Sequence, residues 1–116
     1  MIQSKDLHWL AGLIEGEGSF GWHQIKKRPN TSGTPVLQLK MTDADVVKRA
    51  AALFNRPVRQ YGKTKTGKLV YCVIFNGKDA VGWMMTLFSL LGTRRRQRIK
   101  EIVSKWKLTP NRKKFV

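Results

Sequence analysis

The sequence has little of what disulfide, zinc or membrane proteins need. Its single cysteine, Cys72, can form neither an intrachain disulfide nor a cysteine-based zinc site. Because the chain has only two histidines, His8 and His23, beside this cysteine, a zinc finger is excluded as well. The longest mostly apolar run, Ala80 to Leu91, falls far short of the roughly 20 residues that span a bilayer. Because no basic segment followed by an apolar one opens the chain, we expect no membrane partner.

Acidic residues are also scarce. Seven Asp and Glu stand against 23 Lys and Arg, which gives a formal net charge of +16 at pH 7. Such an excess repels itself in a compact fold, and a polyanionic partner relieves the repulsion. The aromatic residues and apolar runs exclude a disordered chain. We therefore expect an intracellular nucleic-acid-binding protein, cytoplasmic in a bacterium or phage system or else organellar.

The hydropathy pattern predicts one α+β domain over residues 1–116, with a basic, frayed tail at residues 111–116. Helical spacing occurs in ranges 5–15, 44–54, 79–91 and 94–107, and strand patterns in 20–26, 36–41, 57–61 and 69–75. Ser4 is expected to cap the first helix, Gly16 and Gly18 to end it, and Thr42 or Asp43 to cap the second. The third helix should bury Met84 and Met85 in the core. The strands should pair as antiparallel hairpins.

Alternation along the strands predicts which side chains face away from the core. Gln38 and Lys40 oppose the apolar residues of the second strand, and Arg59, Tyr61 and Lys63 oppose Val58. The first strand allows two registers, with either Trp22, Gln24 and Lys26 or His23, Ile25 and Lys27 outward. Since Phe20 and Trp22 are the better core residues, the pattern favours His23 and Lys27 outward.

The segment from Leu10 to Gly18 carries the most chemistry. Gly12 and Gly16 lie four residues apart, hence on one helix face, although glycine inside a helix costs about 1 kcal/mol relative to alanine. Two such glycines are explained if another backbone approaches closely. Glu15 and Glu17 sit near the C-terminal end of the helix, where the helix dipole disfavours negative charge, and a carboxylate there suits a divalent cation beside phosphate. A C-cap, a turn and a solvated pair of acids explain the same residues equally well.

This segment resembles the signature of the LAGLIDADG homing endonuclease family. Six of nine letters match, and Glu15, Gly16 and Glu17 keep the charge or small size of the residues they replace. The element order over about residues 4–107 is similar to that family's α-β-β-α-β-β-α half-domain with a saddle-shaped antiparallel four-stranded sheet. With one copy of the motif, the resemblance implies a homodimer that packs through the signature helix at Gly12 and Gly16.

The resemblance also implies an activity: Mg²⁺- or Mn²⁺-dependent cleavage of both strands of a long, pseudo-palindromic DNA site. Glu17 matches the family's metal-binding acid, one from each subunit, and Glu15 a supporting acid. Asp43 matches a polar residue that orients water, with a capping role as the open alternative. Arg94 matches a basic residue near the scissile phosphate. Lysine is common there, and an arginine that stays protonated is a poor proton carrier.

DNA recognition would fall to the open face of the sheet. The expected contacts are the outward side chains of the strands and the lysines of the second hairpin, namely His23, Lys27, Gln38, Lys40, Arg59, Tyr61, Lys63, Lys65 and Lys68. Lys63, Lys65 and Lys68 look like phosphate contacts. Two alternatives use the same fold: a maturase that binds intron RNA, and a DNA-binding regulator without catalysis. The presence of Glu17 favours the endonuclease.

Overall fold

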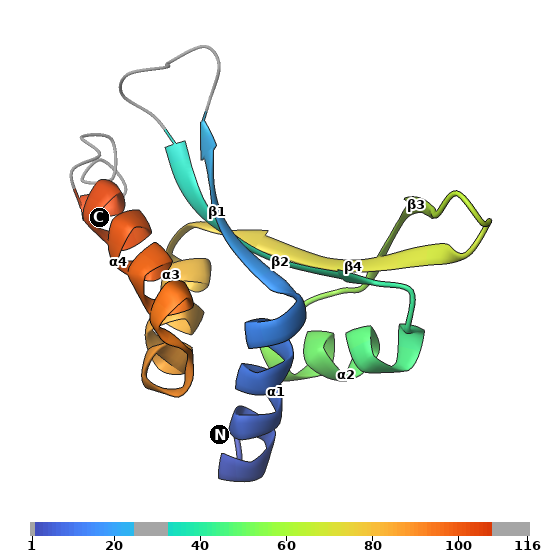
Figure 1. The fold of residues 1–116 in the computed structure, drawn as a ribbon, viewed down its shortest axis with the longest axis horizontal. Coiled ribbons are helices and arrows are strands. Elements are labelled where there is room, and N and C mark those ends of the chain that lie inside the picture. Colours follow the sequence, from blue (N-terminus) through green and yellow to red (C-terminus); the bar gives the residue numbers. More distant parts are fainter. Residues whose placement is uncertain (1, 25–32, 108–116) are drawn as a thin grey trace.

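The computed structural model describes residues 2–24 and 33–107 of the chain. In these residues the elements follow the predicted α+β order (Figure 1): α1 (Ser4–Glu17), β1 (Gly18–Gln24), β2 (Gly33–Met41), α2 (Ala44–Phe54), β3 (Arg59–Lys63), β4 (Leu69–Asn76), α3 (Gly77–Leu87), the short 3₁₀ helix η1 (Phe88–Leu90) and α4 (Thr93–Lys107). No helix in this part of the chain is long and apolar enough to cross a bilayer.

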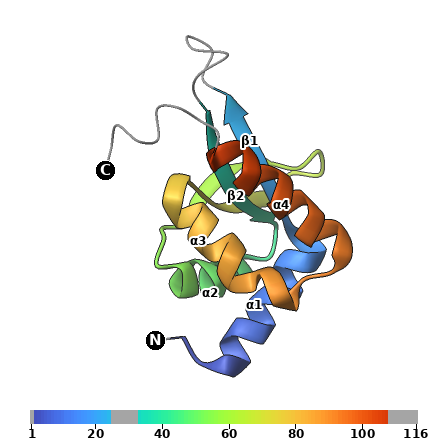
Figure 2. The ribbon, with the colours of Figure 1, turned by 90° about the vertical axis from the view of Figure 1, so that its left-hand side faces the viewer.

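The four strands form one antiparallel sheet in the order β1-β2-β4-β3. The helices lie on one side of the sheet, and Figure 1 shows both ends of the sheet curving away from them. This leaves a saddle-shaped open face on the other side. Figure 2 views the molecule from the side of α3 and α4, which contact each other, while α4 also packs on β1.

The core lies between the helices and the covered face of the sheet. Each of the α-helices α1 to α4 contributes fully buried side chains, and the inner strands β2 and β4 contribute Leu37, Leu39 and Val73, all without exposed surface. Burying one such side chain stabilises the folded state by about 1.5–3 kcal/mol. Because the α-helices and the inner strands share this cluster, its burial holds the helices against the sheet. The predicted alternation of β2 is confirmed, because Gln38 and Lys40 point to the open face.

The ends of several elements differ from the sequence prediction. Helix α1 runs on through Gly16 to Glu17, and only Gly18, whose N–H donates to the Ile14 carbonyl, ends it. Ser4 is not the cap; it lies inside the helix, and its carbonyl accepts from His8 Nδ1 at 2.8 Å. Asp43 does cap α2, accepting from the Val46 N–H at 3.3 Å.

Helix α3 is shorter than predicted, because the chain tightens into η1 at Phe88 and the following turn leads into α4. Met85 was expected in the core but is 54% exposed, because the next residue in a helix is turned by about 100° around the axis, which takes it out of the core that buries Met84. Strand β3 begins at Arg59 rather than Pro57, because proline has no N–H to donate to the ladder.

Candidate nucleic-acid interface and catalytic site

The strand register maps the open face row by row. Ser19, Gln38 and Ile74 lie in one row, Gly21, Val36 and Asn76 in the next, and Lys40, Cys72 and Arg59 in the row on the other side. Side chains directly opposite each other in an antiparallel pair share one side of the sheet. The sheet thus brings the predicted contacts Gln38, Lys40 and Arg59 together on one surface.

The burial pattern settles the register of β1. Phe20 is buried and Trp22 partly buried, whereas His23 is exposed and opposes Thr34 near the end of the hairpin. Of the two registers, the structure has the one with His23 outward. Lys27, the other residue of that register, lies outside the described residues.

The hairpin formed by β3 and β4 carries the remaining predicted contacts. Tyr61 is 63% exposed, and the Lys40 ammonium group lies over its ring at 4.0 Å from the centroid. The alternation predicted for β3 breaks between Gln60 and Lys63, where the register shifts and Gly62 has a φ of 114°. Lys63 therefore pairs with Leu69, and the predicted alternation along β3 that would place Lys63 on the same side as Arg59 and Tyr61 is interrupted. Lys65 and Lys68 are exposed in the turn, as phosphate contacts require.

Cys72 occupies an unexpected place. It is buried, as expected of an apolar strand residue, but its row on the sheet is that of Lys40 and Arg59 on the open face. Burial raises the pKa of the Cys72 thiol, and the neighbouring Lys40 and Arg59 cations oppose this rise. At neutral pH the thiol is thus protonated and is a poor nucleophile.

The ion pairs and hydrogen bonds of the acidic side chains distinguish Glu17 from the other acidic residues. Five of the seven form an ion pair or accept a hydrogen bond, namely Asp6, Glu15, Asp43, Asp79 and Glu101. Asp45 lies in the first turn of α2, where the helix dipole favours it. Glu17 is exposed in the last turn of α1, the unfavourable end, and has no ion-pair partner among the described residues. The described part of the fold therefore forms no ion pair with this carboxylate.

Glu15 has a clear supporting contact. Its Oε1 accepts from the Gly92 N–H at 2.6 Å, although 77 residues separate them in the chain. Gly92 immediately precedes α4, and its carbonyl accepts from the Arg96 N–H at 3.0 Å. The carboxylate therefore ties the end of α1 to the start of α4.

The start of α4 forms a cationic cavity against β1. The cavity has a volume of about 480 Å³ and is lined by Ser19, Phe20, Arg94, Arg95, Gln97, Arg98 and Glu101. Arg98 donates to the Phe20 carbonyl at 3.2 Å and pairs with Glu101 at 3.5 Å. Within the described part of the chain, the buried Nε of Arg95 has no hydrogen-bond partner. Three successive arginines in the first turn of a helix oppose its dipole, and a bound anion would relieve that conflict.

Sequence reasoning found Arg94 but not Arg95 and Arg98. The run of arginines was visible, yet only the packing of α4 on β1 shows that they meet Ser19, two residues after Glu17. Asp43 lies at the start of α2, where its known bond is the capping one. The structure thus brings Arg94 to a cavity beside the end of α1. Asp43 does not line that cavity, because it lies at the start of α2.

One chain offers only part of a metal site. In the described ranges no three His, Cys, Asp or Glu side chains come together. Mg²⁺ nevertheless is commonly held by one or two carboxylates plus substrate phosphates. Glu17 is exposed and has no ion-pair partner among the residues that the structure describes, so it fits that donor set if a second carboxylate and phosphate oxygens come from outside the chain.

The glycines of α1 face open space. Apart from the backbone of its own helix and the chain neighbours, an added Cβ at Gly12 or at Gly16 meets no described atom within 4 Å, and both residues are exposed. Nothing in the described part of the chain therefore requires glycine at either position. The face can accept a second backbone at close range.

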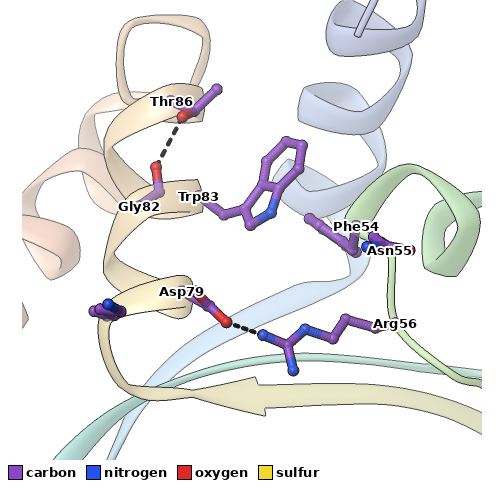
Figure 3. Close-up of a pocket in the computed structure, with 8 residues that line it drawn as sticks. Phe54, Asn55, Arg56, Asp79, Gly82, Trp83 and Thr86 are labelled. Carbon is purple, nitrogen blue, oxygen red and sulfur yellow. Dashed lines mark hydrogen bonds and ion pairs between the residues drawn. The ribbon is translucent and has the colours of Figure 1, made fainter. Parts of the chain in front are cut away.

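A further cavity of about 600 Å³ lies between α2 and α3 (Figure 3). Arg56 and Asp79 form an ion pair at one side of it, and Trp83 packs edge-on against Phe54 with ring centroids 4.9 Å apart. These contacts hold α2 against α3. The cavity belongs to the helical layer and not to the open face.

Comparison with known proteins gives structural matches only. No family model and no curated protein matches the sequence. The homing endonuclease I-CvuI, solved with its target DNA and calcium, is 20% identical with a TM-score of 0.69, over 96% of this chain and 73% of that chain. The intron-encoded homing endonuclease I-CeuI, solved with DNA, is 15% identical with a TM-score of 0.70, over 96% and 58%.

A third match is I-LtrWI, a LAGLIDADG homing endonuclease bound to target DNA. It is 19% identical with a TM-score of 0.69, over 93% of this chain and 39% of that chain. The described chain thus spans less than half of this structure and more than half of the other two. The sheet order, the helical layer and these matches agree that the chain has the fold of the LAGLIDADG homing endonucleases.

Proposed function

We propose that this chain is a LAGLIDADG homing endonuclease that cuts double-stranded DNA as a homodimer with a divalent metal ion. The observation that carries the proposal is the state of Glu17. It is an exposed carboxylate without an ion-pair partner among the described residues, at the unfavourable end of α1, in a protein with 23 cations. A charged residue that lowers the stability of the folded chain and has no compensating ion pair in its described part is typical of a functional site.

The homodimer supplies what one chain lacks. Two copies would pack through the open glycine face of α1, so that the backbones approach at Gly12 and Gly16. A twofold axis between the two α1 helices would bring one Glu17 from each copy to the same region. This arrangement supports a site with two carboxylates and two scissile phosphates. The twofold symmetry also explains why the DNA site would be pseudo-palindromic.

Mg²⁺ or Mn²⁺, when bound, would polarise a phosphate oxygen and lower the pKa of water. The residues of this chain would hold and orient the substrate. Arg94 and Arg95 would bind a backbone phosphate in the cavity beside Ser19, where the N-terminus of α4 adds further N–H donors. Glu15 would keep that helix in place through the Gly92 N–H. Asp43 has one carboxylate oxygen on the Val46 N–H, and its other oxygen would orient a water.

The open face would lie in the major groove, with Gln38, Lys40 and Arg59 toward base edges and the turn lysines toward phosphates. All the structural matches named above were solved with DNA, which supports a duplex as the substrate. A DNA substrate also supports an intracellular location, in the cytoplasm or in an organelle.

The test is a cleavage assay on a library of randomised duplexes. With Mg²⁺ or Mn²⁺ the protein should enrich one family of double-strand breaks, and with a chelator it should bind that site without cutting it. A protein that binds duplex DNA specifically but cuts nothing with either metal is a DNA-binding regulator. One that cuts nothing and binds structured intron RNA more tightly than duplex DNA is a maturase. Either result overturns the endonuclease proposal.

A further inference from the structure

We propose that four uncharged side chains at the centre of the open face select A·T base pairs. They are Val36 and Gln38 on β2 and Ile74 and Asn76 on β4, and together they form what we term the central patch. The inference rests on the proposed function, because it requires the open face to lie on duplex DNA. It adds the base composition that the centre of each half-site must have.

The strand register arranges the central patch as a checkerboard. Gln38 lies opposite Ile74, and Val36 lies opposite Asn76. Each amide side chain therefore has an aliphatic neighbour directly across the strand and another two residues along its own strand. Strands β2 and β4 are the inner strands of the sheet, so the patch sits at the middle of the open face.

Both amide groups are free to bind a ligand. Within the described residues neither Gln38 nor Asn76 has a side-chain hydrogen bond. Asn76 occupies the N-cap position of α3, where asparagine ordinarily accepts a bond from the first turn, yet it makes no such bond. The helix thus begins without using the group that the sequence supplies.

The aliphatic members are placed for apolar contact. Ile74 is 44% exposed, while its neighbours Val73 and Phe75 are buried in the core. The strand therefore turns an isoleucine toward the open face in a protein whose surface is dominated by cations. Val36 is partly exposed on the diagonal next to it.

An A·T pair is the base pair that this combination fits. In the major groove, adenine presents N7 and N6 to a glutamine or asparagine amide, and thymine presents a C5-methyl group to an aliphatic side chain. A G·C pair offers no methyl group and is read best by arginine or lysine. Those cations stand in the row of Lys40 and Arg59, two residues farther along the strands, or about two base pairs away. We infer an A·T centre flanked by a G·C position.

The experiment begins with the duplex sites that bind the intact protein most tightly in a randomised library. Uracil then replaces each thymine, which removes only the methyl group, and 7-deazaadenine replaces each adenine, which removes only N7. At one thymine of the A·T centre, loss of the methyl should weaken binding about fourfold. At the neighbouring adenine, loss of N7 should weaken binding about tenfold.

The variants assign these effects to residues. Ile74→Ala should bind the thymine and uracil duplexes equally, and Gln38→Ala should no longer distinguish adenine from 7-deazaadenine. Ile74→Val should keep part of the methyl effect, and Met85→Ala, an exposed apolar residue on α3, should keep all of it. Thermal melts of each variant confirm that it folds.

The outcomes separate the two proposals. Failure to bind any duplex specifically overturns the proposed function and this inference with it. Specific binding to sites with a G·C centre overturns the inference alone. So does an A·T site whose affinity is unchanged by uracil, or a methyl effect that survives in Ile74→Ala.

Discussion

Replacing the glycines of α1 by alanine should have opposite effects on the single chain and on the dimer. In Gly12→Ala and Gly16→Ala the added Cβ meets no atom of the described residues within 4 Å, apart from the chain neighbours and the backbone of its own helix. Alanine is better than glycine in a helix interior by about 1 kcal/mol, so Gly12→Ala should stabilise the folded chain by nearly that amount, and Gly16→Ala, in the last turn of α1, by less. For a domain of this size that corresponds to a rise of roughly 4 °C in Tm.

The dimer should be weakened by the same methyl group. If two α1 backbones meet at these glycines, each added Cβ overpacks the interface by about 1–3 kcal/mol, and the twofold symmetry counts it twice. The combined cost of about 2–6 kcal/mol would weaken the dimer at least about 30-fold. Gly12→Leu, with a much larger side chain, should abolish assembly.

Sedimentation velocity over a concentration series measures the dimer, and thermal melts at high dilution measure the chain alone. The wild-type dimer should have twice the mass of the 13.3 kDa chain. The matched control is Gly82→Ala in α3, where an added Cβ likewise meets no described atom within 4 Å outside its own helix and chain neighbours. It should gain the same helix stability and leave the dimer constant unchanged. If Gly12→Ala behaves like Gly82→Ala in both measurements, the glycine face is not the interface.

Three further predictions concern a supporting contact, the buried thiol and the charge. Glu15→Ala should lower stability by about 1 kcal/mol, because the Gly92 N–H loses its acceptor, whereas Glu15→Gln keeps an oxygen and should lose less in a thermal melt. Since burial raises the pKa of the Cys72 thiol, its alkylation at pH 8 should be slow in the folded protein, speed up as the pH rises, and become fast on unfolding; mass spectrometry would detect rapid labelling that contradicts this. Binding to nonspecific duplex DNA should weaken steeply with salt, with a log–log slope of about −0.9 for each phosphate contacted, and a flat salt titration would rule out a cationic DNA face.

The arrangement of helices and strands could be predicted because the hydrophobic periods are strong. In β2 the alternation of Leu37, Gln38 and Leu39 has only one register that fills the core, and the structure has it. The end of α1 was predicted too early, because Gly16 and Gly18 are local signals for a helix end. Packing of Ile14 in the core and the bond from the Gly18 N–H to its carbonyl carry the helix on to Glu17.

Only the part of the candidate site whose residues lie close together in the sequence could be predicted. Glu17 and the glycines stand together in the sequence, so their pattern can be recognised. The cationic cavity joins Ser19 to Arg94 and Arg95, about 75 residues away, and depends on how α4 packs on β1. Both faces of β4 are apolar, so alternation could not show that Cys72 and Ile74 face away from the core. The irregularity in β3 depends on the positive φ of Gly62.

The most direct test of the proposed function compares Glu17→Gln with Glu15→Gln on the selected duplex site. Gel-shift titrations and cleavage time courses would be run side by side in Mg²⁺. Glu17→Gln should bind the site at least as tightly as wild type, since it removes a negative charge facing the phosphates, but should cut it slower by orders of magnitude. Glu15→Gln should lose much less cleavage, because Glu15 acts through its bond to Gly92. Cleavage by Glu17→Gln at the wild-type rate would contradict the account of this site.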